Sequence, residues 1–162
     1  MEFDIDLSGE DIFSKDSTIV IADNNDIIRG YKFNEEIIKI LISRYKNGKY
    51  RYSNSKQQKV FFRIRTYCII IHYLFKDILP KIKDQKIILN ICRDFQGHEK
   101  DITSNLLFLL RDKLGLKIEI RYLKLSKNSN ADRYAFLMRK DDKDKIKGYV
   151  KIPIRDIEKL LK

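Results

Sequence analysis

The chain has 162 residues, of which 43% are hydrophobic and only six are glycine and two proline. This composition supports one domain with a sizeable core, and it argues against a disordered or repeat-built chain. The 34 lysines and arginines outnumber the 23 aspartates and glutamates, which gives a formal net charge of +11. Such an excess indicates a polyanionic partner, with nucleic acid (DNA or RNA) the leading candidate, although a lysine-rich surface can also be solvated without a partner.

The cysteines and the hydropathy pattern bear on where the protein resides. Cys68 and Cys92 lie far apart, each in an apolar run, without the close spacing of zinc or redox motifs. The first residues lack the basic and apolar regions of a signal peptide, and no apolar stretch reaches the length of a membrane span. We therefore expect a soluble, cytoplasmic protein with buried, reduced thiols and no membrane partner.

The N-terminal part of the sequence predicts an antiparallel meander. Residues 3–7 alternate apolar and acidic side chains, as a strand with Phe3, Ile5 and Leu7 on one face does. Two further strands are predicted at 18–22 and 27–33, joined by a polar turn. Asp23 in that turn is interpreted as a turn residue, although a shifted strand assignment would make it the first-strand carboxylate.

The rest of the sequence predicts helices that alternate with strands. Asn34 is a good N-cap for the first of these helices, and Pro80 is expected to end the second. The predicted elements are helices at 35–46 and 56–79, a strand at 86–92, a helix at 102–114, a strand at 117–125, a helix at 130–138, a strand at 149–154 and a terminal helix. This order predicts a single α/β domain over 1–162, with a mixed sheet flanked by helices.

Three aspartates stand where this order brings segments together. Asp6 lies on the first strand, Asp94 follows the strand at 86–92, and Asp132 opens a late helix. Ligands of open α/β sheets bind at strand ends, and converging carboxylates there would hold Mg²⁺ or Mn²⁺. Two such ions, about 3.5–4 Å apart, can activate water and stabilise the leaving oxygen during phosphodiester cleavage.

Two short motifs carry a resemblance to a known superfamily. Ile5-Asp6-Leu7-Ser8-Gly9 resembles the Ile-Asp-x-Ser-Gly opening strand of uncharacterised families in the ribonuclease H-like (integrase-like) superfamily, and Asn130-Ala131-Asp132-Arg133-Tyr134-Ala135 resembles their closing Ala-Asp-x-x-Ala helix. Asp94 stands where the superfamily carries its second aspartate. The resemblance spans nearly the whole chain and implies a ribonuclease H-like fold, with Asp6, Asp94 and Asp132 as catalytic, metal-binding carboxylates of a nuclease.

The sequence departs from this superfamily at its usual acidic residue on the first helix. Glu35 or Glu36 would have to fill that role, or Glu99 beside the second aspartate would substitute as a catalytic residue. His98 is either a general base beside the second aspartate or a solvated loop residue. Each aspartate alone also has a structural explanation, as the solvent face of an edge strand, a turn former or an acid at a helix N-terminus.

A basic, aromatic segment fills the middle of the chain. Residues 37–76 contain ten lysines and arginines and no aspartate or glutamate. Aromatic residues are interleaved with these cations, and we expect them to be exposed for stacking on unpaired bases; they are Tyr45, Tyr50, Tyr52, Phe61 and Phe62. Predicted nucleic-acid-binding residues are Arg44, Lys49, Arg51, Lys56, Lys59, Arg63 and Arg65. The alternative is an amphipathic helix with a solvated basic face and a core stripe that runs from Phe61 to Phe75.

Several enzyme classes are excluded because their motifs are absent from the sequence: there is no Gly-rich phosphate loop, nucleophile elbow, zinc-finger spacing or His-Glu-x-x-His helix. The expected function is a nucleic-acid-binding, Mg²⁺- or Mn²⁺-dependent nuclease. The alternative is a non-catalytic nucleic-acid-binding or adaptor module with the same fold. A more distant third is an interaction protein whose charge maintains solubility.

Overall fold

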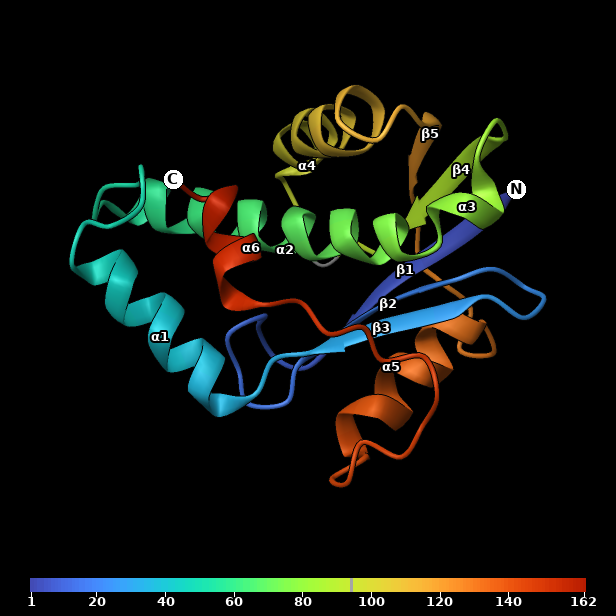
Figure 1. The fold of residues 1–162 in the computed structure, drawn as a ribbon, viewed down its shortest axis with the longest axis horizontal. Coiled ribbons are helices and arrows are strands. Elements are labelled where there is room, and N and C mark those ends of the chain that lie inside the picture. Colours follow the sequence, from blue (N-terminus) through green and yellow to red (C-terminus); the bar gives the residue numbers. More distant parts are fainter. Residues whose placement is uncertain (94) are drawn as a thin grey trace.

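The computed structural model describes residues 1–93 and 95–162, which form a mixed α/β fold (Figure 1). Its open sheet has five strands in the order β3-β2-β1-β4-β5. Their bounds are β1 (Glu2–Ser8), β2 (Thr18–Ala22), β3 (Ile28–Lys32), β4 (Lys86–Ile91) and β5 (Lys117–Tyr122). β1, β2 and β3 pair antiparallel, whereas β4 pairs parallel with both β1 and β5. The predicted mixed sheet and its opening meander are therefore confirmed.

Of the described helices, three begin at side-chain caps that the sequence supplies. Their bounds are α1 (Glu35–Lys46), α2 (Lys56–Asp77), α3 (Leu79–Ile82), α4 (Glu99–Leu106), α5 (Asn130–Lys140) and α6 (Ile154–Lys159). Asn34, Ser55 and Ser129 each accept a hydrogen bond from the backbone N–H three residues later, which satisfies one of the free donors at the first turn. α4 continues directly into a wider helical turn, η1 (Leu107–Asp112).

The helices form two unequal layers around the sheet. α5 packs against β1, β2 and β3 on one face, while α2 packs on the opposite face together with α4, η1 and α6 (Figure 1). α1 lies beside the N-terminal part of α2, beyond the end of the sheet (Figure 1). The two layers bury both faces of β2, whereas every second residue of the edge strand β5 is exposed.

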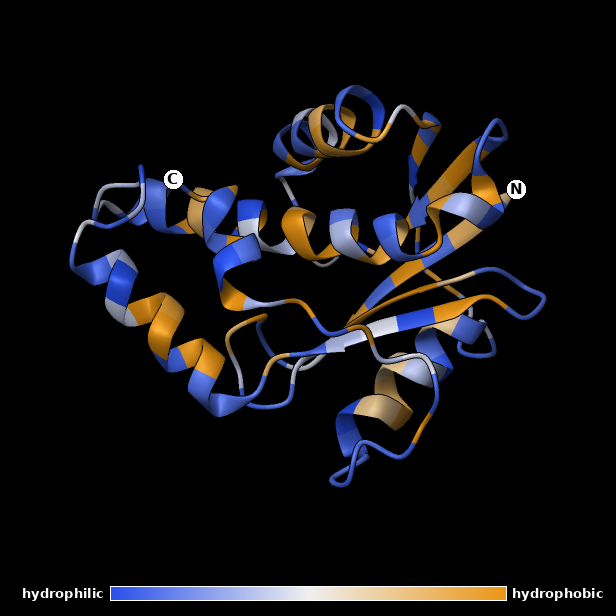
Figure 2. Ribbon diagram, viewed as in Figure 1, coloured by the Kyte–Doolittle hydropathy of each residue, from blue (hydrophilic) through white to orange (hydrophobic). Residues whose placement is uncertain are grey.

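The main core lies between β1 and α2, where hydrophobic residues of both elements meet (Figure 2). Phe3 and Ile5 are fully buried, and the ring of Phe3 meets that of Phe75 edge-on at 5.2 Å. The predicted apolar face of the first strand is confirmed. On α2 the buried set is broader than the predicted stripe, since every residue from Ile64 to His72 is buried.

Several predicted elements differ from those observed. The helix predicted at 102–114 begins at Glu99 and ends as η1 at Asp112, and the strand predicted at 117–125 ends at Tyr122. α2 ends at Asp77, and Pro80 lies in the first turn of α3, where a missing N–H costs nothing. The predicted strand at 149–154 is wrong: within the described chain this segment makes one isolated bridge, from Tyr149 to Gly30 of β3, and α6 begins at Ile154. Of the residues that the structure describes, no helix combines the length and apolar character needed to cross a membrane.

Candidate active site

Asp6 is a buried carboxylate on the central strand of the sheet. It lies in β1, opposite Val20 of β2, and only 6% of it is exposed. Its side chain alternates with the core-facing Ile5, so it points to the face that α5 covers. The alternative interpretation of Asp6 as the solvent face of an edge strand is therefore wrong. Asp4, on the same face, accepts a 2.9 Å hydrogen bond from the side-chain amide of Asn90.

The packing of α5 against the sheet brings Asp132 to this face. Ala131, Ala135 and Met138 form its buried stripe and pack in a small cluster with Val20 and Ala22 of β2. Two alanines on one helical face let the helix approach the strands closely. The consequence is that Asp132, in the first turn of α5, lies beside β1 rather than out in solvent.

Glycine at position 30 of β3 is also needed for this close approach. A Cβ atom on Gly30 would lie 2.4 Å from the Met138 sulfur and 3.1 Å from a methyl of Val20. A side chain at this position would have to displace the thioether end of Met138 and would press on Val20. Arg139 forms a second tie between α5 and β1, because its Nε donates a 2.9 Å hydrogen bond to Ser8 Oγ.

The carboxyl groups of Asp6 and Asp132 lie close enough to interact electrostatically. Burial is the main cause that raises the pKa of Asp6, and the negative charge of Asp132 raises it further. Hydrogen bonds from the Leu7 backbone N–H and the Cys92 thiol favour the ionised form and act the other way. The net effect is to raise the pKa of Asp6 from 3.8 to about 6. Asp6 thus keeps its proton up to mildly acidic pH, as one of two adjacent carboxyl groups does.

Cys92 joins this site from the neighbouring parallel strand. It follows β4 directly, and its backbone N–H donates a 3.2 Å hydrogen bond to the carbonyl oxygen of Ile5. The sequence indicated only a buried thiol; the parallel register of β1 and β4 is what places Cys92 next to Asp6. Asp94, the third predicted carboxylate, lies outside the described residues. Among the residues that are described, no three His, Cys, Asp or Glu side chains gather to hold a metal ion.

The other predicted acidic residues are not joined to this pair. Glu99 begins α4, and its carbonyl oxygen accepts a 2.9 Å hydrogen bond from Tyr122. The charge of Glu99 is not among the causes that shift the pKa of Asp6. Glu35 forms an exposed ion pair of 3.3 Å with Lys39 on α1. His98 lies 3.5 Å from the carboxylate of Asp101, its neighbour on α4.

Two of the seven predicted nucleic-acid-binding residues have structural partners instead. Arg65 is 6% exposed; its guanidinium donates to the carbonyl oxygen of Leu160 at 3.1 Å and to the side-chain oxygen of Asn105 at 2.8 Å. Arg44 pairs with Glu158, a buried carboxylate of α6. These contacts tie α1 and α2 to the C-terminal segment, so we omit both arginines from the candidate phosphate-binding surface.

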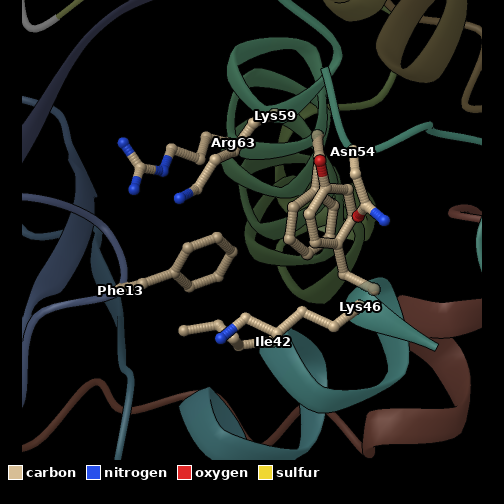
Figure 3. A pocket seen from close by; sticks show the side chains of 8 residues that line it. Phe13, Ile42, Lys46, Asn54, Lys59 and Arg63 are labelled. Carbon is tan, nitrogen blue, oxygen red and sulfur yellow. The ribbon is translucent and has the colours of Figure 1, made fainter. Parts of the chain in front are cut away.

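The remaining predicted cations lie on the surface. Lys49, Arg51, Lys56 and Lys59 are exposed, and Arg63 is partly exposed. Lys59 and Arg63 extend from the same side of α2 (Figure 3), as the helical spacing predicts. Arg63 also lies 3.4 Å from the carboxylate of Asp11.

Most of the interleaved aromatics are packed rather than exposed. Tyr45, Tyr50 and Phe62 are at most 5% exposed, so the prediction that they are open to solvent is wrong. The rings of Tyr45 and Phe62 stack at 4.5 Å with an interplanar angle of 2°. The physical reason is that α1 and the loop after it fold back onto α2, and their tyrosines meet Phe62 there. Tyr52 and Phe61 remain partly exposed.

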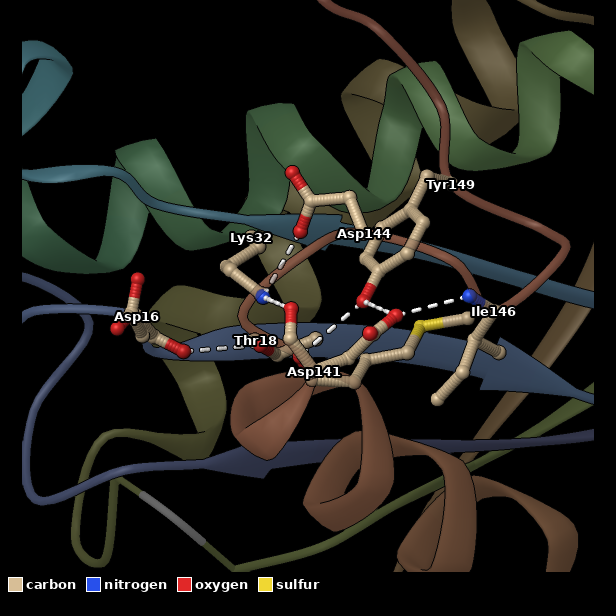
Figure 4. Close-up of polar contacts among 8 residues, drawn as sticks. Asp16, Thr18, Lys32, Asp141, Asp144, Ile146 and Tyr149 are labelled. Atoms are coloured by element: carbon tan, nitrogen blue, oxygen red, sulfur yellow. Dashed lines mark hydrogen bonds and ion pairs between the residues drawn. The ribbon is translucent and has the colours of Figure 1, made fainter.

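A second group of acidic residues, near β3, is fully explained by structural bonds (Figure 4). Lys32 Nζ donates to the carbonyl oxygen of Asp141 at 2.6 Å and to the carboxylate of Asp144 at 2.9 Å. The Asp141 carboxylate accepts from the Ile146 backbone N–H at 2.8 Å and from the Tyr149 hydroxyl at 3.0 Å. The Ile146 bond is the main cause that lowers the pKa of Asp141. These contacts fix the loop after α5 and leave no converging carboxylates there.

Comparisons with known protein families, with curated proteins and with solved structures found no match. The chemistry of the site therefore follows from the Asp6–Asp132 pair. Two adjacent carboxylates, one of them buried, either share a proton or bind a cation whose charge relieves their repulsion. Carboxylate oxygens are the donors that Mg²⁺ and Mn²⁺ prefer, so this pair suits either ion in chemical type.

Proposed function

We propose that this chain is a nucleic-acid-binding, divalent-metal-dependent nuclease of the ribonuclease H-like superfamily, with its reaction centre at Asp6 and Asp132. The observation that carries the proposal is the contact between these two carboxyl groups, which are 126 positions apart in the chain and meet across β1 and α5. Each belongs to one of the two motifs that resemble the superfamily. The order of three antiparallel strands followed by parallel strands with helices between them also agrees with what that resemblance implies.

Asp6 and Asp132 would hold Mg²⁺ or Mn²⁺, with Asp94 as the third carboxylate on sequence grounds. The Cys92 thiol is a soft donor, and it serves better as a hydrogen-bond donor to Asp6 than as a ligand of a hard cation. When bound, such an ion supplies an activated water and positive charge for the phosphate that is cleaved.

The chain's own residues prepare this centre in two ways. Burial under α5 removes solvent from Asp6, which strengthens its electrostatic interactions. The Leu7 N–H and the Cys92 thiol orient the Asp6 carboxylate, and the Ser129 cap fixes the first turn that carries Asp132. Rigid elements, rather than loops, therefore set the spacing of the two carboxyl groups.

Metal-dependent stabilisation and cleavage together test this proposal. Mn²⁺ should raise the melting temperature of the wild-type protein, and the Asp6→Asn, Asp94→Asn and Asp132→Asn variants should lose that shift. The same three variants should lose cleavage of labelled single- and double-stranded DNA and RNA in Mg²⁺ or Mn²⁺. Asp4→Asn is the matched control, because Asp4 lies on the same face of β1 and is bonded to Asn90. A wild-type protein that neither cuts nor gains stability with metal would contradict the proposal.

The second candidate is a non-catalytic nucleic-acid-binding module with the same fold. The observation that favours it is that the described residues contribute no third metal ligand to the carboxylate pair. In that case the exposed cations of α2 would still bind nucleic acid, and Asp6 and Asp132 would only share a proton. Binding that is unaffected by Mn²⁺, without any cleavage, would support this module.

A further inference from the structure

A cavity of about 430 Å³ lies between α1, the first turns of α2 and the loop that joins β1 to β2 (Figure 3). It is separate from the carboxylate pair, which lies under α5 on the other face of the sheet. Its lining residues are Phe13, Ile42, Tyr45, Lys46, Asn54, Lys59, Phe62 and Arg63. A volume of this size falls within the range of small-molecule and cofactor sites, roughly 300–1,000 Å³.

The floor and walls of this cavity are flat and apolar. Phe62 stacks on Tyr45 on one side and on Phe13 on the other, with ring centroids 4.5 Å and 5.3 Å apart. Phe13 also meets Phe33 edge-on at 6.1 Å, which holds its ring in place. Ile42 of α1 closes the lower side of the cavity (Figure 3). Because Phe62 is covered by these neighbours, Phe13, which is partly exposed, is the ring that a planar ligand can contact.

The rim of the cavity is cationic. The side chains of Lys46 on α1 and of Lys59 and Arg63 on α2 extend past the apolar floor toward Phe13 (Figure 3). None of the described residues that line the cavity is acidic. Asp11, just outside it, lies 3.4 Å from one Arg63 nitrogen, which leaves other guanidinium donors for a ligand. Positive charge with a planar apolar floor suits an anion attached to a flat ring.

We infer that this cavity binds one unpaired nucleotide of a single-stranded nucleic acid, an inference that rests on the proposed function and names its substrate class. The base lies against Phe13 and Ile42, which are partly exposed, and its phosphate binds Lys46, Lys59 and Arg63. A paired base in a duplex is already stacked and cannot enter a cavity between two helices. A simple anion would not need the apolar floor, and a neutral apolar ligand would not need three cations.

A neighbouring cavity of about 390 Å³ shares one lining residue with this site, Arg63. The second cavity is also lined by Leu7 at the end of β1, by Phe95 and His98, and by the acidic residues Glu10 and Asp11. Leu7 follows Asp6 on the strand, so the two side chains point to opposite faces of the sheet. A strand held at the first cavity and continued past Arg63 would therefore reach the C-terminal end of β1 on the face opposite to the Asp6 side chain.

Removal of two rim charges tests the phosphate contacts. Fluorescence anisotropy would measure the affinity of a labelled single strand of roughly 12 nucleotides, as DNA and as RNA, with EDTA present to prevent cleavage. The double variant Lys46→Gln/Lys59→Gln should bind roughly tenfold more weakly. The control is Lys83→Gln/Lys117→Gln, which removes the same charge from exposed lysines away from the cavity. This control should change affinity less than about twofold.

A second matched pair tests the apolar floor. Ile42 and Ile40 are both partly buried on α1, but only Ile42 lines the cavity. Ile42→Glu should weaken single-strand binding roughly tenfold and abolish the preference over a blunt duplex, while Ile40→Glu should keep both. Circular dichroism checks that both variants fold.

Pocket variants that bind like their controls, or a wild type that binds blunt duplex as tightly as single strand, would overturn the inference. If those variants bind normally while metal-dependent cleavage persists, the cavity assignment fails and the nuclease stands. If they bind weakly but the wild type never cleaves, the cavity stands and the nuclease fails.

Discussion

Replacement of Asp6 by asparagine should stabilise the fold at neutral pH. Burial and the charge of Asp132 raise the pKa of Asp6 from 3.8 to about 6. One pKa unit corresponds to 1.36 kcal/mol, so ionised Asp6 destabilises the folded protein by up to about 3 kcal/mol at pH 7. Asparagine has the same shape without the charge, and its side-chain oxygen still accepts the Leu7 hydrogen bond. We expect the variant to gain about 1–3 kcal/mol in free energy of unfolding.

The gain should depend on pH with a definite sign. Because the pKa of Asp6 is higher in the folded than in the unfolded protein, the folded state retains a proton between about pH 4 and 6 that the unfolded state has released. Wild-type stability should therefore carry a component that falls as pH rises through this window and is constant above it. The Asp6→Asn variant lacks that component, so the difference should be small at pH 4 and largest above pH 6.

Urea denaturation of both proteins at pH 4, 6 and 8, without metal, measures this difference. Asp4→Asn is the control, since Asp4 is half-buried and its Asn90 bond survives as an amide pair. We expect that control to change the free energy of unfolding by less than about 0.5 kcal/mol. An Asp6→Asn variant that is less stable than wild type at pH 8, or whose difference is independent of pH, would refute the raised pKa of Asp6.

Three further outcomes follow from the charged residues. The logarithm of single-strand affinity should fall linearly with log salt, by about 0.7 per phosphate contacted, and an affinity that is flat from low to moderate salt would contradict phosphate binding. Arg65→Met should lower the free energy of unfolding in urea by about 1–3 kcal/mol, because two interior acceptors lose their donor, whereas Lys59→Met should change it by less than about 0.5 kcal/mol. Glu158→Gln should lower it by about 1 kcal/mol, since Glu158 is buried but its partner Arg44 is partly screened by solvent; an unchanged melting temperature would show that this ion pair is not structural.

The sheet was largely predictable because its strands carry local signals. Alternation in residues 3–7 and the apolar run at 86–91 mark strands, and the side-chain caps mark where helices begin. The segment 149–154 carries a similar apolar pattern, yet only Tyr149 bridges to β3. Pairing with a neighbour decides whether such a segment is a strand, and that neighbour is not visible locally.

The two residues of the carboxylate pair could be predicted from the sequence, but the burial of Asp6 could not. Alternation places Asp6 on the face opposite Ile5, and this polar face looks exposed from sequence alone. It is buried because α5, more than a hundred residues later, covers it. The role of Cys92 was missed for the same reason, since it depends on the register of two strands that are remote in sequence.

The acid-free run gave a misleading picture of its arginines. Arg44 has no acidic neighbour within the run, but Glu158 reaches it from a position 114 residues away. Arg65 uses neutral acceptors, which a count of charges does not detect. An excess of one charge over a stretch of sequence therefore predicts the sign of the surface charge. It does not predict which of the charged side chains are free to bind a ligand.

The absence of a side chain at Gly30 leaves a flexible residue, rather than backbone, at the point where α5 meets β3. Met138 occupies the space that a Cβ atom would need, six residues or about 9 Å along α5 from Asp132. Its thioether is the end of an unbranched side chain, so it can move aside for a methyl group at position 30 while the helix backbone keeps its place. The contact between Asp6 and Asp132 should therefore survive small changes at position 30, because the side chain between them and that position absorbs the change.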